Sequence, residues 1–230
     1  MLIFIIVIFN HLNYILLPKI MLKYTGGEII AKYLIKEGVK YVIGIPGHGN
    51  LPLVDAFFKD KDKLKLIQPK QEMSGVHLAV GYYRVTRQPL CVFTSIGPGA
   101  INTAIGVADA FVDSFPCLII TGDTHVHMRG KGVLQEIERK KDSGLPKILE
   151  PIVKRSFEVD TVGQLPTIMQ RALSFVFRYS SESGFFSQIG KSHSITIRFC
   201  GTRQKSKVSC KDCPIGIAKI EPADGAVPVC

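Results

Sequence analysis

A few residues in this 230-residue chain could do chemistry together, and they lie in turns or at helix starts. Glu72 opens a predicted helix, and its carboxyl could share a proton with a bound molecule. His48 follows the turn Pro46-Gly47, and Gly97-Pro98-Gly99 precedes a helix whose first turn contains Asn102. Contact with a substrate is one interpretation of His48, and a plain loop histidine is the other.

These residues also have simpler interpretations. An acid such as Glu72 in the first turn of a helix gains about 0.3–1 kcal/mol from the helix macrodipole, whatever its function. The turn at Gly97 could form a phosphate-binding nest, but its spacing matches neither the Walker pattern nor the dinucleotide fingerprint. We therefore assign no phosphate to it.

A segment rich in glycine and polar residues runs from Gly122 to Gly132, and Gln135 follows it. A mobile loop near a ligand and an ordinary surface excursion are both consistent with this composition.

The elements that must position these residues alternate between strand and helix. Periodicity and turn residues predict helices over 26–37, 51–58, 71–85, 100–112 and 163–177, and short apolar strands over 41–45, 64–68, 90–95, 117–121 and 153–159. This alternation predicts an α/β fold, a doubly wound parallel sheet with helices on both faces. Ligands of such sheets collect at the carboxyl ends of the strands. The loops at 46–50, 68–72, 95–99 and 121–125 are therefore the candidate site.

Those loops carry a resemblance to a known family. The motifs are Gly44-Ile45-Pro46-Gly47, Glu72 with Gly81-Tyr82 behind it, Ser95-Ile96-Gly97-Pro98-Gly99-Ala100-Ile101-Asn102, Asp113-Ser114-Phe115-Pro116, Ile120-Thr121-Gly122-Asp123 and Gln135-Glu136. Over roughly residues 24 to 177 the chain resembles the N-terminal pyrimidine-binding domain of a thiamine-diphosphate-dependent enzyme, acetolactate synthase large subunit type.

The resemblance implies a role for each matching residue. In that family a glutamate at the position of Glu72 hydrogen-bonds the ring nitrogen N1′ of the cofactor and serves in catalysis by sharing its proton. The implied cofactor-binding residues are Pro46, Gly47, Glu72, Gly97, Pro98, Gly99 and Asn102. Gln135 matches a family glutamine that approaches the active centre, and His48 is the substrate or loop residue suggested by its place in the first site loop. Lys70-Gln71 stand where the family commonly has Arg-His, so the substrate chemistry could differ.

The resemblance also implies that part of the cofactor is bound by a domain other than this one. In the family a separate C-terminal domain holds the diphosphate and Mg²⁺, so we expect this chain to bind the pyrimidine half of thiamine diphosphate, to hold no metal and to be inactive alone, as a fragment of a carboligase or decarboxylase. A homo-oligomer or a diphosphate-domain partner would complete the site. The alternative is a non-catalytic interaction (dimerisation) domain, with or without a membrane tether. Neither the substrate nor the use of FAD follows from the sequence.

Both ends depart from the pattern, so the pyrimidine-binding domain is predicted over 21–177. Residues 1–20 form an apolar extension, which is either a membrane anchor or the product of a start codon placed before Met21. Residues 178–230 read as an irregular basic tail that is not native to the family, although Ile195–Phe199 could supply one strand.

Composition limits the remaining functions. The net charge is +10, but the basic residues are scattered, so we expect no nucleic-acid partner. Cys91 and Cys117 sit in apolar runs, which predicts buried reduced thiols and a cytoplasmic location. Cys210 and Cys213 form one Cys-x-x-Cys pair, but no second pair completes a zinc knuckle.

Overall fold

A parallel sheet lies at the centre of the computed structural model, which describes residues 22–137, 144–178, 195–200, 205–208 and 220–221. The sheet has six strands in the order β3-β2-β4-β5-β7-β6, and every neighbouring pair is parallel. The strands are β2 (Tyr41–Gly44), β3 (Lys65–Ile67), β4 (Cys91–Thr94), β5 (Leu118–Asp123), β6 (Arg155–Val159) and β7 (Ile195–Cys200). The predicted parallel α/β sheet is confirmed.

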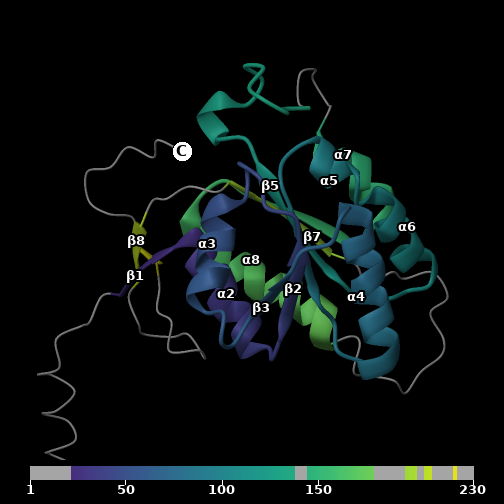
Figure 1. Ribbon diagram of the computed structural model, residues 1–230. Coiled ribbons are helices and arrows are strands. Elements are labelled where there is room, and N and C mark those ends of the chain that lie inside the picture. Colours follow the sequence, from purple (N-terminus) through teal and green to yellow (C-terminus); the bar gives the residue numbers. More distant parts are fainter. Residues whose placement is uncertain (1–21, 138–143, 179–194, 201–204, 209–219, 222–230) are drawn as a thin grey trace, which may run out of the picture.

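Helices cover both faces of this sheet (Figure 1). On one face α2 packs against both α3 and α8, and on the other α4 packs against α6. Their bounds are α2 (Gly26–Lys36), α3 (Leu51–Lys59), α4 (Glu72–Thr86), α5 (Pro98–Ile101), α6 (Ala104–Val112), α7 (Leu145–Leu149) and α8 (Leu165–Leu173). Single 3-10 turns are η1 (Val126–Met128), η2 (Glu150–Ile152) and η3 (Val162–Gln164), and the π-helical turn η4 (Ser174–Arg178) follows α8.

The prediction of one helix over 100–112 is wrong. The chain becomes helical two residues earlier, at Pro98, and the helix is interrupted between Ile101 and Ala104. At the interruption the buried Thr103 hydroxyl donates a 2.6 Å hydrogen bond to the Ala100 carbonyl. A side chain that bonds a carbonyl of the preceding turn competes with the helix ladder. The interruption separates α5 from α6 and leaves Asn102 at the end of α5.

Segment 195–200 supplies an inner strand, as the sequence analysis allowed for Ile195–Phe199. β7 pairs with β5 on one side and with β6 on the other, so β6 forms the edge of the sheet. A second, antiparallel sheet contains β1 (Leu22–Thr25), β8 (Lys205–Val208) and β9 (Ile220–Glu221). Three stretches of the region after residue 177 therefore form strands.

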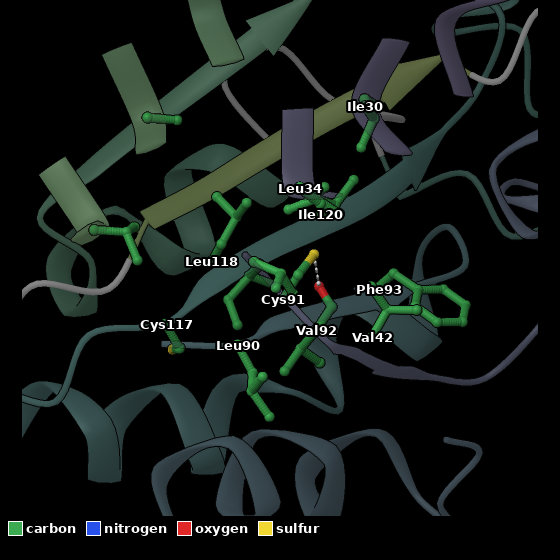
Figure 2. Packing of buried hydrophobic residues seen from close by; sticks show 14 of the residues in the cluster. Ile30, Leu34, Val42, Leu90, Cys91, Val92, Phe93, Cys117, Leu118 and Ile120 are labelled. Carbon is green, nitrogen blue, oxygen red and sulfur yellow. Dashed lines mark hydrogen bonds between the residues drawn. The ribbon is translucent and has the colours of Figure 1, made fainter. Parts of the chain in front are cut away.

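Apolar side chains from both helix layers and the sheet form one core (Figure 2). Cys91 and Cys117 are buried in it as free thiols, which confirms that prediction. Burial raises the pKa of the Cys91 thiol, so it stays protonated.

Two glycines let α4 pack closely on its neighbours. Gly75 faces Ile43, and a side chain at Gly106 would meet Val76 of α4 at 2.7 Å. The close packing of α4 on α6 holds α4 in place against the sheet, and with it Glu72, the first residue of α4.

Several sequence predictions fall on other parts of the chain. The apolar extension at 1–20 lies outside the described residues, as do Cys210, Cys213 and most of the predicted tail. In the ranges that the structure describes, no helix is long and apolar enough to cross a membrane.

Candidate functional site

The site lies where the connections of the sheet change direction. β2 is followed by α3 on one face, whereas β4 is followed by α5 and α6 on the other. In parallel α/β sheets the crevice between two such strands binds ligands at the carboxyl ends. The loops after β2 and β4 meet here, because a side chain at Gly47 would come within 2.5 Å of the Ser95 hydroxyl.

The loop after β2 is held by one buried amide. The Asn50 side chain accepts a hydrogen bond from the Gly47 amide at 2.8 Å and donates one to the Ile45 carbonyl at 3.0 Å. The Ser95 hydroxyl accepts a third bond, from the Gly49 amide at 3.4 Å. These bonds fix the backbone of Pro46 and Gly47 before any ligand arrives.

Glu72 lies in the first turn of α4, half-buried, with its two carboxylate oxygens in different surroundings. Oε2 accepts a 2.6 Å hydrogen bond from the Asn102 side-chain amide. Oε1 faces Gly99, where an added Cβ would approach it to 3.1 Å. The structure thus brings together Glu72, Asn102 and Gly99, three of the predicted site residues. One oxygen is oriented by a neighbour, and the other lies beside Gly99 without a hydrogen bond from the described residues.

The turn at Gly97 contacts the segment that contains Gln135. Gly97 has a φ of +61°, and an added Cβ would clash with the backbone carbonyl of Gln135. Gln135 also has a positive φ, of +62°, and its side chain is exposed. The structure therefore places Gln135 beside the turn of Gly97 and Pro98, joined through the backbone.

The glycine-rich segment before Gln135 is tied down by charged side chains. The buried Glu136 carboxylate accepts hydrogen bonds from the backbone amides of Gly130, Gly132 and Val133. Arg129 donates to the Asp123 carboxylate at 2.7 and 3.1 Å and lies 2.9 Å from an oxygen of Asp160. These bonds tie the segment to the ends of β5 and β6, an arrangement that neither the mobile loop nor the surface excursion describes.

His48 lines a cavity of about 210 Å³ between the loop after β2 and this segment. The lining also includes Thr124 and His125, which follow β5, and the apolar side chains of Ile96 and Leu134. The loop after β2 reaches the end of β5 through a close backbone contact, since a side chain at Gly122 would meet the Gly49 carbonyl at 2.6 Å. The structure thus separates the predicted residues into a group around Glu72 and a neighbouring cavity beside His48.

Comparison with known proteins identifies the domain. Residues 24–142 match the family model described as thiamine pyrophosphate enzyme, N-terminal TPP binding domain, which covers more than half of the chain. The chain belongs to this family. It is an N-terminal TPP-binding domain of the acetolactate synthase-like type, as the motifs in its loops predicted.

The most similar relatives include large subunits of acetolactate synthases. The chain is 34% identical to the acetolactate synthase large subunit of Haemophilus influenzae over 152 residues, a stretch that covers 66% of this chain and 25% of the relative. It is 33% identical to the isozyme 1 large subunit of Escherichia coli over 150 residues, which cover 65% of this chain and 25% of that relative. For the mitochondrial catalytic subunit of Saccharomyces cerevisiae the identity is 36% over 114 residues, or 50% of this chain and 16% of the relative. The chain spans about a quarter or less of the length of these relatives.

In this TPP-binding domain two glycines allow close approaches at the crevice. A Cβ at Gly99 would crowd Oε1 of Glu72, and a Cβ at Gly47 would clash with Ser95, so the backbone packs tightly at both positions. The donor set, one carboxylate and one amide, suits a nitrogen heterocycle that exchanges a proton. Within the residues that the structure describes, no three Asp, Glu, His or Cys side chains gather as metal ligands.

Sequence reasoning missed three residues that shape the site. Asn50 holds the loop after β2, Thr124 lines the cavity, and Arg129 ties the segment after β5 to Asp123. Asn50 had a signal, because Asn favours turns in which its side chain bonds the nearby backbone. Arg129 pairs with groups that converge only in the folded sheet, so its sequence carried no comparable signal.

Proposed function

We propose that Glu72 binds the aminopyrimidine ring of thiamine diphosphate at N1′, so that the chain supplies the pyrimidine half of the cofactor site. The observation that carries the proposal is the arrangement of the carboxylate. Asn102 holds Oε2 at 2.6 Å, whereas Oε1 lies beside Gly99 and accepts no hydrogen bond from the described residues. A helix-start acid stabilised only by the macrodipole needs neither neighbour.

The residues of this chain would hold the ring and manage one proton. Thiamine diphosphate, when bound, supplies a carbon that attacks substrate carbonyls. Glu72 would share a proton with N1′, because a carboxyl within hydrogen-bond reach can donate or accept it. Asn102 would keep that carboxyl in position by its bond to Oε2. Pro46, Gly47, Gly97 and Pro98 would flank the ring as backbone surfaces that bring no side chain into its space.

Other parts of the site belong to the proposal as well. His48 and Gln135 would lie on the substrate side, since His48 lines the cavity next to the crevice and Gln135 packs on the turn of Gly97. We place Mg²⁺ and the diphosphate on a different domain, by analogy with the family. The reaction would be a carboligation or decarboxylation of the acetolactate synthase type.

The α4 and α6 face supports a homo-oligomer. Leu78, Val85, Ile105 and Val112 expose apolar side chains on these two packed helices, and Val85 is 85% exposed. Large apolar side chains clustered at a surface mark interaction sites. A Val85→Asp variant should shift sedimentation toward the monomer, and an unchanged sedimentation profile would contradict this part of the proposal.

Calorimetric titration with thiamine diphosphate and Mg²⁺ tests the central assignment. Glu72→Gln removes the acidic proton but keeps the shape, so we expect at least about tenfold weaker binding, or about 1.4 kcal/mol. Glu37→Gln is the matched control, because Glu37 is an exposed glutamate at the end of α2. Equal affinities for Glu72→Gln and the unmodified chain would show that Glu72 does not bind the ring.

A further inference from the structure

Strand β3 forms one edge of the six-stranded sheet, and no strand of the described residues lies on its outer side. On its inner side it pairs in parallel with β2, where the Lys65 amide donates a 2.9 Å hydrogen bond to the Lys40 carbonyl. Alternate residues of a strand direct their backbone groups to opposite sides, so the N–H and C=O of Leu66 point away from β2. The edge therefore offers backbone groups to another strand.

Apolar side chains accompany these backbone groups. Leu66 is 36% exposed and Ile67 is 40% exposed, and the two lie on opposite faces because side chains alternate along a strand. Phe58, near the end of the neighbouring helix α3, is 67% exposed. An edge that only had to be kept from pairing would gain nothing from such side chains, since exposed apolar residues on an edge strand promote association.

Lysines set the charge of the partner that this edge can accept. Residues 60–70 contain four lysines and two aspartates. Lys40, Lys63 and Lys65 are exposed and form no ion pair with the described residues. Like charges that face each other across paired strands are destabilising, so the same edge of a second copy is a poor partner. An acidic strand is complementary.

We infer that the β3 edge binds an extended acidic segment of a partner protein by strand addition, with backbone hydrogen bonds to Leu66 and carboxylates toward Lys40, Lys63 and Lys65. Main-chain hydrogen bonds give affinity in this mode of recognition, and alternate side chains give specificity. The inference goes beyond the proposed function and requires no thiamine diphosphate.

Titration of the full chain with a hexapeptide that alternates glutamate and valine tests the inference by nuclear magnetic resonance. We expect saturable shifts of the β3 amides that diminish as salt is raised, and none with a hexapeptide that alternates lysine and valine. Lys63→Glu combined with Lys65→Glu should weaken binding at least about tenfold. Lys131→Glu is the matched control, because Lys131 is an exposed lysine in the segment after β5, and it should leave binding unchanged.

Leu66→Pro tests the backbone hydrogen bond. Proline removes the outward N–H and is tolerated on edge strands. Leu66→Ala removes the same side chain and keeps the N–H. Leu66→Pro should therefore bind the acidic hexapeptide about fivefold more weakly than Leu66→Ala, the usual effect of losing one hydrogen bond. A version of the hexapeptide with N-methylated valines keeps its charge but loses amide donors, so it should not bind the unmodified chain.

Three results would overturn the inference. Without saturable binding of the acidic hexapeptide, the lysines would serve only to protect the edge from pairing. Equal binding of the N-methylated hexapeptide would show that charge alone attracts the peptide and that no strand is added. Equal binding of an oligothymidylate, with the same amide shifts, would show a site for polyanions such as nucleic acid.

Discussion

Glu72 owes its arrangement to two small features of neighbouring residues. Asn102, at the end of α5, donates a hydrogen bond to Oε2, and Gly99 carries no Cβ beside Oε1. Neither feature is a property of Glu72 itself. The carboxylate is therefore sensitive to changes at both neighbouring positions.

Gly99→Ala tests this sensitivity. The new methyl group would lie 3.1 Å from Oε1 of Glu72, closer than most carbon–oxygen contacts, so the carboxylate must shift. We expect thiamine diphosphate binding to weaken at least about tenfold, measured by calorimetry. The folded state should keep its stability, because alanine is a better helix former than glycine in α5. Unchanged affinity would mean that the space beside Oε1 is not used.

At the scale of single residues, the sequence predicted the participants better than their contacts. Glu72, Gly99 and Asn102 were all identified from motif spacing, and the structure brings them together. The hydrogen bond between Asn102 and Glu72 could not be foreseen, because it joins two helices that meet only in the folded domain. The interruption at Thr103 could not be foreseen either. A hydroxyl that competes for a helix carbonyl leaves no clear mark in a pattern of apolar residues.

Individual helices show where local sequence rules hold. α2 begins with a capping box, in which Thr25 and Glu28 exchange side-chain and backbone hydrogen bonds at 3.3 and 2.8 Å. Lys59 of α3 reaches the same carboxylate at 3.2 Å. The box therefore joins the start of α2 to its neighbour on the same face of the sheet.

Stability should depend on pH through Glu28. Burial raises the pKa of Glu28, but hydrogen bonds from Thr25 and Lys59 outweigh burial and leave the pKa below its ordinary value. A lowered pKa in the folded state means that this stabilisation is present above the unfolded pKa and is lost as pH falls through the folded one. Urea unfolding across acidic pH should show the loss, and Glu28→Gln should reduce it. Glu37→Gln should leave it intact, and equal slopes in all three proteins would contradict the assignment.

α4 contains a glycine, Gly81, at a position where the described residues leave space for a side chain. A Cβ at Gly81 would meet nothing within 4 Å, although the residue lies in the middle of a 15-residue helix. Gly81→Ala should raise the free energy of unfolding by about 1 kcal/mol, measured by denaturant titration at low protein concentration. A loss of self-association in the same variant would place Gly81 at a contact between copies, whereas lower stability of the monomer would contradict the open space.

At the scale of the whole molecule, the loop after β2 and the end of β5 touch at the carboxyl ends of the strands. Gly122 at the end of β5 packs against the backbone of Gly49, so the loop after β2 is supported by a strand two places away in the sheet. Both the crevice beside Glu72 and the cavity beside His48 rely on this contact. They are neighbouring parts of one surface.

Gly122→Ala should disturb both parts together. Its methyl group would come within 2.6 Å of the Gly49 carbonyl, and neither backbone can yield easily because both residues are buried. Overpacking of this kind costs about 1–3 kcal/mol, which urea unfolding would measure. We expect weaker binding of thiamine diphosphate as well. Full stability with unchanged affinity would show that the two loops are independent.

At this scale the parallel sheet with helices on both faces was predicted, because short apolar strands alternate with amphipathic helices from residue 26 onward. The position of β7 was not predicted. Strand order depends on pairing between distant segments, and 195–200 reads only as a short apolar run. The antiparallel pairing of β1 with β8 was missed for the same reason.

The place of β7 has a consequence for how the chain is made. β7 is the last strand of the six to leave the ribosome, yet it pairs between β5 and β6, which are synthesised before it. Until residue 200 emerges, β5 presents an open edge to the cell, and such an edge invites pairing with other chains. The nascent protein therefore has a vulnerable interval between the synthesis of β5 and that of β7, and slower translation of this stretch would lengthen the exposure of the open edge.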